Sequence, residues 1–185
     1  MDAGEALPQP FSYATWSDLL ERVVHADGKV DYDRLARERA LLDAFVAELD
    51  ACSPASHPQA FPREEDQLAY WINAYNAFTL DAIIDEYPIA SVWKSRDGQF
   101  FQRKRHSSGG VALSLDDIEH TILRQRLAEP RIHFAINCGS NGCPPMRPAA
   151  FEAAGIHATL EAATRQFLGN EWNCRVDHAA RRIYV

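Results

Sequence analysis

The 185-residue sequence has no long apolar run, no excess of basic residues and no obvious export signal. No stretch approaches the roughly 20 apolar residues that a membrane-spanning helix needs, so no membrane insertion is expected. A formal net charge of -7 argues against a nucleic-acid partner, because such binders need a basic face to neutralise phosphates. We expect a soluble protein. Its compartment stays open: periplasmic or secreted if a signal peptide has been removed, and otherwise cytoplasmic.

Cysteine is scarce, and several common catalytic motifs are absent from the sequence. Four cysteines, at positions 52, 138, 143 and 174, are too few and too scattered to build a disulfide scaffold. The chain contains no internal repeat, no glycine-rich phosphate loop and no nucleophile-elbow serine motif. Cysteine chemistry or metal binding remain as the specific options, and no cofactor is expected.

The apolar content of 46% is ample for one hydrophobic core. We expect a disordered lead over residues 1–10 and a single domain over residues 11–185. Because the last expected strand runs to Val185, the interpretation allows for a truncated C-terminus.

Apolar residues recur at helical spacing in most of the chain, which predicts helices over residues 11–25, 32–49, 63–84, 114–127 and 148–168. Two pairs of strands are expected, at residues 99–102 with 111–113 and at residues 172–176 with 182–185. The fold class is therefore α+β, with a helical N-terminal part packed on a small antiparallel sheet.

Two asparagines stand in the most apolar of these segments. Asn73 and Asn76 lie three residues apart, and hence on one face of the expected helix over residues 63–84. A buried amide without a partner costs about 1–3 kcal/mol. The two side chains are expected either to tie loops to the helix or to orient a catalytic group.

Glu119 falls inside the apolar stripe of the expected helix over residues 114–127. A carboxylate in that position needs a cationic or hydrogen-bonding partner. His120 follows it directly, and a histidine on a helix is more often structural or exposed than catalytic. The neighbouring inward-facing Glu119 favours a functional role for the pair.

The segment RIHFAINCGSNGCPPMR, residues 131–147, predicts a short strand over residues 132–136, with Cys138 at its end, and then a loop rich in glycine and proline. Gly139 and Ser140 could present backbone N–H groups to an anionic intermediate. Cys143 is interpreted as a loop fastener, either through a disulfide with Cys138 or as a buried small residue. In a strand His133 would point away from Cys138, so the segment predicts no metal site.

Three blocks together resemble the DUF547 family, a group of proteins of unknown function. They read YWINAYNA at residues 70–77, LDDIEHTILR at 115–124 and HFAINCGS at 133–140, and GKVDY at 28–32 also fits. The resemblance covers residues 11–185. It implies a domain widespread in bacteria and an architecture distantly related to papain-like and transglutaminase-like cysteine enzymes.

The resemblance also implies roles for particular residues. Cys138 would be the nucleophile, His120 the base and Glu119 the acidic member, with Asn73 and Asn76 as supporting polar groups. The expected function is acyl transfer or hydrolysis on a small-molecule or peptide substrate with an amide or thioester bond.

Two alternatives to this enzyme remain open. One is a non-enzymatic, redox-responsive module whose Cys138 binds or is capped by a small thiol such as glutathione. The other is an inert interaction domain that has kept the pocket only for packing.

Overall fold

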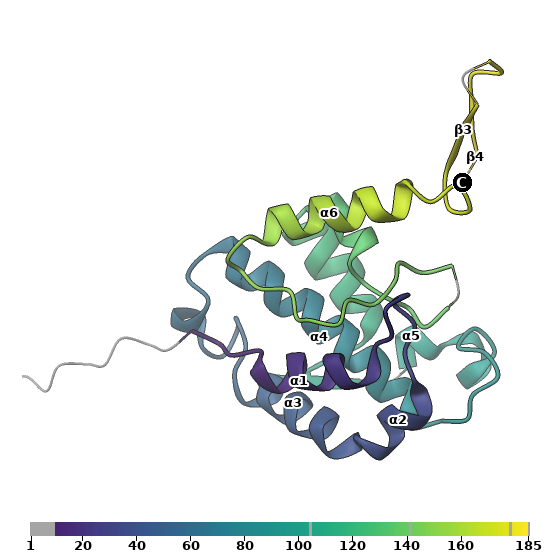
Figure 1. Ribbon diagram of the computed structural model, residues 1–185. Helices are drawn as coiled ribbons and strands as arrows, with labels where there is room; N and C mark the ends of the chain where they lie inside the picture. The colour runs from purple at the N-terminus through teal and green to yellow at the C-terminus, as the bar shows by residue number, and fades with distance from the viewer. Residues whose placement is uncertain (1–9, 104, 141, 178, 185) are drawn as a thin grey trace, which may run out of the picture.

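A computed structural model describes residues 10–184 except 104, 141 and 178 (Figure 1). The expected disordered lead thus lies almost entirely outside the described residues. The longer helices are α1 (Ala14–Val23), α2 (Tyr32–Arg37), α3 (Arg39–Ala51), α4 (Glu64–Ile84), η3 (Asp117–Arg126) and α6 (Ile156–Leu168). The short helices are η1 (Pro58–Ala60), η2 (Ser95–Gly98), α5 (Phe100–Arg103) and η4 (Pro130–Phe134), and the strands are β1 (His106–Ser108), β2 (Val111–Leu113), β3 (Arg175–Asp177) and β4 (Arg182–Tyr184).

The fold is α+β, as predicted, with most of the chain helical and two small antiparallel hairpins, β1–β2 and β3–β4. None of the helices formed by the described residues combines the length and apolar character that a bilayer span requires.

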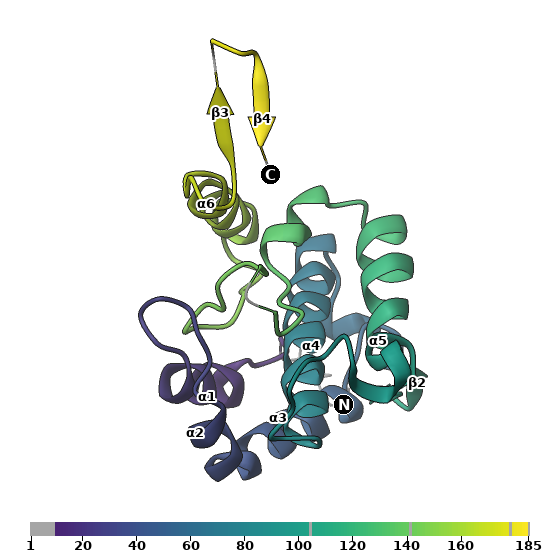
Figure 2. The same cartoon turned by 90° about the vertical axis from the view of Figure 1, so that its right-hand side faces the viewer.

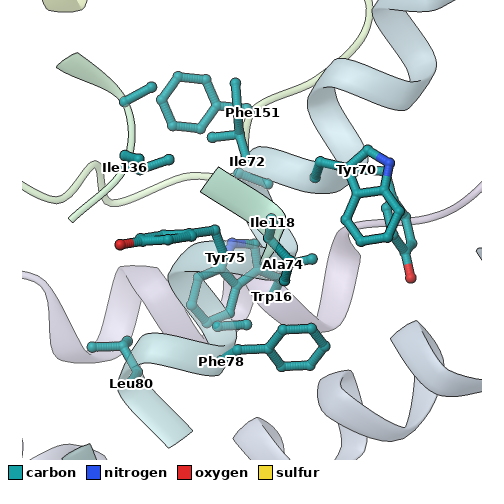
Figure 3. Close-up of a cluster of buried hydrophobic side chains, with 14 of the residues drawn as sticks. Trp16, Tyr70, Ile72, Ala74, Tyr75, Phe78, Leu80, Ile118, Ile136 and Phe151 are labelled. Atoms are coloured by element: carbon teal, nitrogen blue, oxygen red, sulfur yellow. The ribbon is translucent and has the colours of Figure 1, made fainter. Parts of the chain in front are cut away.

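Helix α4 is the centre of the fold, and α1, α3, η3 and α6 surround it (Figures 1 and 2). Every residue from Leu68 to Ile83 is buried, as a sequence that is apolar or aromatic at almost every position predicts. Side chains from the surrounding elements, among them Trp16, Ile118 and Phe151, meet those of α4 in one apolar cluster (Figure 3). Burying each large apolar side chain contributes roughly 1.5–3 kcal/mol, so this cluster is the main source of stability.

The predicted helix over residues 32–49 is divided at Glu38 into α2 and α3. The Asp31 side chain caps α2 by accepting from the Arg34 N–H at 2.8 Å. The break lets Arg39 at the start of α3 reach α4, where its guanidinium donates to Asp81 at 2.7 Å and to Asp85 at 2.8 Å. These ion pairs fix the N-terminal helices to the central helix.

The strand predicted at residues 99–102 is wrong, because Phe100–Arg103 form a short helix instead. The strand that pairs with Val111–Leu113 is His106–Ser108, in the register His106 opposite Leu113. Gly109 and Gly110 have φ of +59° and +78° and form a two-residue turn. A turn that short requires the first strand to end directly before it, at Ser108.

The strand predicted at residues 132–136 is also wrong, since Pro130–Phe134 form a short helical turn. Pro130 occupies its first position, where a missing N–H costs nothing, and the Glu129 side chain accepts from the Arg131 N–H at 3.0 Å. The apolar content of the segment reflects burial of Ile132 rather than a sheet.

Helix α6 is shorter than the predicted helix over residues 148–168 and begins only at Ile156. Gly155 precedes it with φ of +80°, in the left-handed region. Before Gly155, the Phe151 backbone N–H and C=O both bond to the Asn73 side chain. These groups are therefore not available for the backbone hydrogen bonds of a helix.

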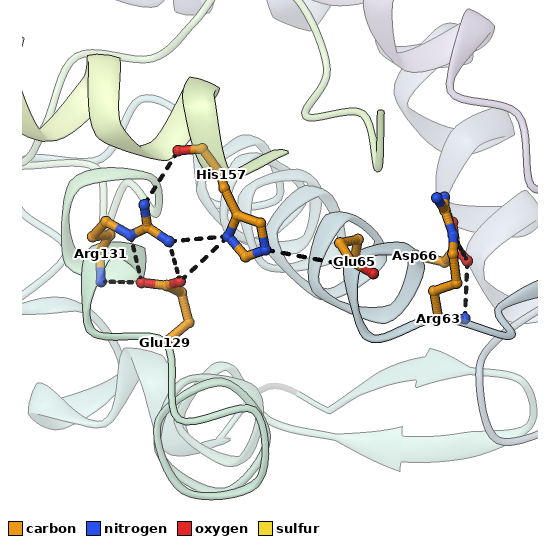
Figure 4. A network of polar contacts seen from close by, with 6 residues as sticks. All are labelled: Arg63, Glu65, Asp66, Glu129, Arg131 and His157. Carbon is orange, nitrogen blue, oxygen red and sulfur yellow. Dashed lines mark hydrogen bonds and ion pairs between the residues drawn. The ribbon is translucent and has the colours of Figure 1, made fainter. Parts of the chain in front are cut away.

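The start of α6 is held to α4 and η4 by charged groups (Figure 4). Arg131 donates to both oxygens of Glu129, at 2.8 and 2.6 Å, and His157 lies 3.8 Å from both Glu129 and Glu65. Beyond α6, the hairpin of β3 and β4 projects away from the body of the molecule (Figures 1 and 2).

Candidate functional site

The three side chains predicted to be catalytic, Glu119, His120 and Cys138, line one cavity of about 380 Å³. It lies between η3, the α5 region and the loop that follows η4. Its lining includes Asp116, Glu119, His120, His133, Cys138 and Cys143, with apolar walls from Tyr75, Trp93, Phe101 and Ile136. We call it the first cavity.

Glu119 is held in the first cavity by two partners. The Tyr75 hydroxyl donates to its Oε2 at 3.2 Å, and Arg124 donates to its Oε1 at 2.8 Å. Burial, with the neighbouring Glu119 carboxylate adding to it, raises the pKa of Tyr75 well above its usual range, so this hydroxyl stays a donor. Glu119 therefore has the partners that its position in the apolar stripe requires.

The helix carrying Glu119 is a π-helix, and this explains the pairing with Arg124. Its last turn closes with the Leu127 N–H donating to the Ile122 carbonyl, five residues back. In an α-helix residues five apart point roughly 140° from each other. The π-helical turn is wider than an α-helical one and brings Arg124 next to Glu119. Glu119 therefore pairs with Arg124 and not with His120.

His120 has Asp116 as its acidic neighbour, with 3.6 Å between Nε2 and Asp116 Oδ1. The His120 side chain is 53% exposed, so it can exchange protons with solvent and with a ligand in the first cavity. Gln102 donates to the same Asp116 oxygen at 3.3 Å. Asp116 thus takes the orienting position that the resemblance implied for Glu119.

Cys138 and Cys143 form a disulfide, with 2.07 Å between the sulfurs and 6.2 Å between the Cα atoms. This agrees with the interpretation of Cys143 as the residue that fastens the loop. Nucleophilic chemistry at Cys138 therefore requires reduction first. The free cysteines among the described residues, Cys52 and Cys174, do not line the first cavity.

Of the two backbone donors expected after Cys138, the Gly139 N–H already has a partner. The Gly139 N–H donates to Asn137 Oδ1 at 2.8 Å, and the Cys138 N–H contacts Cys143 Sγ at 3.2 Å. Ser140 Oγ lies 3.7 Å from the sulfur of Cys138 and 3.6 Å from that of Cys143. Gly139 and Ser140 line a different cavity.

The two asparagines of α4 turn out to serve different loops, and neither side chain lines the first cavity. Asn73 binds the backbone of Phe151 and accepts from Trp16 Nε1 at 3.2 Å. Asn76 donates to the Ala135 carbonyl at 3.0 Å and accepts from the Asn137 N–H at 2.9 Å. Asn76 therefore supports the backbone directly before Cys138, whereas Asn73 supports the segment before α6.

His133 is the cavity residue that sequence reasoning set aside. Arg124 Nη2 lies 3.4 Å from His133 Nδ1, and since a guanidinium can only donate, Nδ1 accepts and the ring proton sits on Nε2. The strand assumption turned His133 away from Cys138, but η4 is helical and the parity argument does not apply. Pro130, typical of a first helical position, was the signal for this turn.

Comparison with known families adds one match. The family model described as "Protein of unknown function, DUF547" matches residues 58–168, more than half of the chain. No curated protein and no solved structure matches the chain. Within the described part of the chain, no three or more His, Cys, Asp or Glu side chains are grouped so as to hold a metal ion.

Proposed function

The chain belongs to the DUF547 family of proteins of unknown function, and from this premise we propose that it is a cysteine-dependent enzyme acting on an amide or thioester. The observation that carries the proposal is the shared cavity. Cys138, His120 and Glu119, from segments separated by the turn at η4, line one space of about 380 Å³. Such a volume is typical of small-ligand sites.

In the proposed reaction the reduced Cys138 thiol gives its proton to His120, and the thiolate attacks the substrate carbonyl carbon. The carbonyl electron pair moves to oxygen, then returns and expels the amine or thiolate, which takes the proton back from His120. Water or another acceptor releases the acyl group from Cys138 in the same way. Asp116, 3.6 Å from His120, stabilises the imidazolium that forms between these steps.

The oxyanion formed on the substrate needs a hydrogen-bond donor. The Gly139 N–H already bonds to Asn137, and both Gly139 and Ser140 line the other cavity, so neither is well placed to supply that donor. We assign the role to the Nε2–H of His133. Arg124 donates to Nδ1 of this ring, which leaves Nε2 as the ring nitrogen that can donate to the oxyanion.

The test is alkylation of Cys138 in the reduced protein between pH 5 and pH 9, read at that residue by peptide mass spectrometry. His120→Ala should slow alkylation at neutral pH by roughly tenfold, because the imidazolium stabilises the thiolate. The matched control is His25→Ala, which removes an exposed histidine that does not line the first cavity. Equal rates in all three proteins would reject the proposed Cys138 and His120 pair.

A second candidate function is supported by the bonded sulfurs themselves. The Cys138–Cys143 disulfide lines the first cavity, and a small thiol such as glutathione could open it and remain attached. The protein would then be a redox-responsive binding module without turnover. A stable mixed disulfide, together with no acylation of Cys138 by thioester probes, would favour this function over the enzyme.

A further inference from the structure

The loop that carries the disulfide borders a second cavity, larger than the first, with a volume of about 500 Å³. Cys143 and Pro144 line both cavities, whereas Cys138 lines only the first. The walls of this second cavity come from the turn after α1, from the loop of residues 137–145 and from the end of α6. From the second cavity, the sulfur within reach is therefore that of Cys143.

We propose that the second cavity docks a low-molecular-weight thiol peptide, which attacks Cys143 and frees Cys138 as a thiolate in the first cavity. The inference rests on the proposed function, because it treats Cys138 as the working thiol. In the exchange the thiolate of the peptide bonds to Cys143 Sγ, and the Cys143–Cys138 bond breaks. Its electron pair leaves with Cys138, so that one disulfide is replaced by another and no further oxidant or reductant is consumed.

The charges of the two cavities favour this side of approach. Among the described residues, those lining the first cavity include the carboxylates of Asp116 and Glu119 and no Lys or Arg. Those lining the second include one carboxylate and one ammonium, Asp27 and Lys29, which lie 3.0 Å apart. An incoming thiolate that also carries carboxylates meets less repulsion in the second cavity.

The other side chains of the second cavity suit a short peptide. Gln166, Asn170 and Asn173 offer amide groups of the kind that pair with peptide bonds. Trp172, whose side chain is 94% exposed, and Phe167 offer apolar surface beside them. A volume of about 500 Å³ is in the range of sites that enclose small ligands.

The identity of the leaving group also favours attack on Cys143. A thiol whose anion is stabilised leaves faster, and attack on Cys143 makes Cys138, which shares the first cavity with His120, the leaving group. The Cys138 N–H lies 3.2 Å from Cys143 Sγ and acts in the opposite sense, since it would stabilise a Cys143 thiolate. This opposing contact is a single hydrogen bond from one backbone amide.

The experiment maps the first sulfur attacked. The oxidised protein is pulsed briefly with reduced glutathione, quenched with acid, treated with N-ethylmaleimide and cleaved after Arg131. The peptide that begins at Ile132 contains both Cys138 and Cys143, and fragmentation between them assigns each label. We expect glutathione on Cys143 and maleimide on Cys138. The reverse pattern, or an even mixture, overturns the proposal.

Two charge reversals test the docking side. Lys29→Glu places a carboxylate in the second cavity and should slow the glutathione reaction by roughly two- to fivefold, the range for one exposed charge. Lys94→Glu is the matched control, next to Trp93 of the first cavity, and should leave the rate unchanged. Slowing by Lys94→Glu alone, or equal rates in all three proteins, overturns docking in the second cavity.

The assignment of glutathione to Cys143 or Cys138 is independent of the test of the proposed function. Labels are assigned to sulfurs without any measurement of acyl transfer. If His120→Ala leaves Cys138 alkylation unchanged while glutathione still attaches to Cys143, the proposed enzyme fails and the docking site stands. If alkylation depends on His120 but glutathione attaches to Cys138, the docking site fails alone.

Discussion

The substitution Asn76→Ala tests whether α4 supports the backbone that carries Cys138. The Asn76 side chain is 2% exposed and makes two hydrogen bonds to the segment between η4 and the disulfide. Alanine removes both and leaves the Ala135 carbonyl and the Asn137 N–H without the partners that the structure gives them. Water cannot easily replace the amide there, because the surrounding helix face is buried.

The magnitude follows from the number of groups that lose a partner. Each buried polar group left unsatisfied costs roughly 1–3 kcal/mol, so the two together should lower the free energy of unfolding by roughly 2–6 kcal/mol. Whole domains are stable by about 5–15 kcal/mol, so the variant should remain folded at low temperature and unfold well before the wild type. Urea titration of the oxidised protein, followed by far-UV circular dichroism, measures the loss.

Asn73→Ala is the matched control, since Asn73 is equally buried on the same helix but binds Phe151 and Trp16. It should lose at least as much stability as Asn76→Ala. In the reduced proteins at low temperature, however, only Asn76→Ala should change the alkylation rate of Cys138. A stability loss below about 0.5 kcal/mol for Asn76→Ala, or the same change of alkylation rate in both variants, would refute the assigned role.

Three further outcomes are expected. Reducing the disulfide, whose cysteines are five residues apart, should lower the free energy of unfolding by about 2 kcal/mol, because the bond restricts the unfolded chain. Urea titration with and without a phosphine reductant measures this loss, and an unchanged free energy would contradict the expectation. Hydrogen bonds from Arg131 hold the pKa of Glu129 below its usual 4.5. The pair therefore stabilises the folded state fully above pH 4.5, and this stabilisation is lost as the pH falls through the folded-state pKa. Glu129→Gln should therefore lower the thermal midpoint at pH 7 by an amount that shrinks toward strong acid, and a difference that grows there would contradict the pairing. Gly139 and Gly110 both have a positive φ, so replacing either by alanine should lower the free energy of unfolding by about 1–2 kcal/mol. The thermal midpoint should fall further for Gly139→Ala, because its Cβ would lie 2.6 Å from Ile83 Cδ1.

The helices were predictable because their signal is local and repeated. Leu68–Ile83 is apolar or aromatic at almost every position, which predicts a helix buried on most of its circumference, and the whole segment is buried. The inward position of Glu119 likewise predicted that the carboxylate needs a partner. Arg124 could not be identified as that partner from the sequence. The pairing requires a π-helical turn, which a spacing of five residues does not indicate.

What could not be predicted depends on the path of the chain in three dimensions. Asn73 and Asn76 have the same spacing, burial and chemistry, and the sequence left open whether each ties a loop or orients a catalytic group. Asn73 meets the segment before α6, and Asn76 meets the segment before Cys138, because two different loops cross the same helix face. No pattern within α4 distinguishes the two crossings.

His133 was missed for a related reason. Its segment is apolar and β-branched enough to favour a strand, and strand parity then turns its side chain away from Cys138. The structure has a helical turn there, so His133 reaches the first cavity and Arg124. The error came from the local conformation, and it removed a candidate site residue that the corrected conformation restores.

The conformation after Cys138 also decides what can activate its thiol. The described residues from Gly139 to Gly155 form no helix, so no helix dipole stabilises a Cys138 thiolate. The partners left for a thiolate among the described residues of the first cavity are the histidines His120 and His133, and Nδ1 of His133 is already occupied by Arg124. In the reduced protein, thiolate formation should then depend on His120 alone: His120→Ala should raise the pH midpoint of Cys138 alkylation, whereas His133→Gln should leave it in place and slow acyl transfer. A shift of the midpoint by His133→Gln as large as that by His120→Ala would show that His133 is protonated, and would remove it from the role of neutral donor.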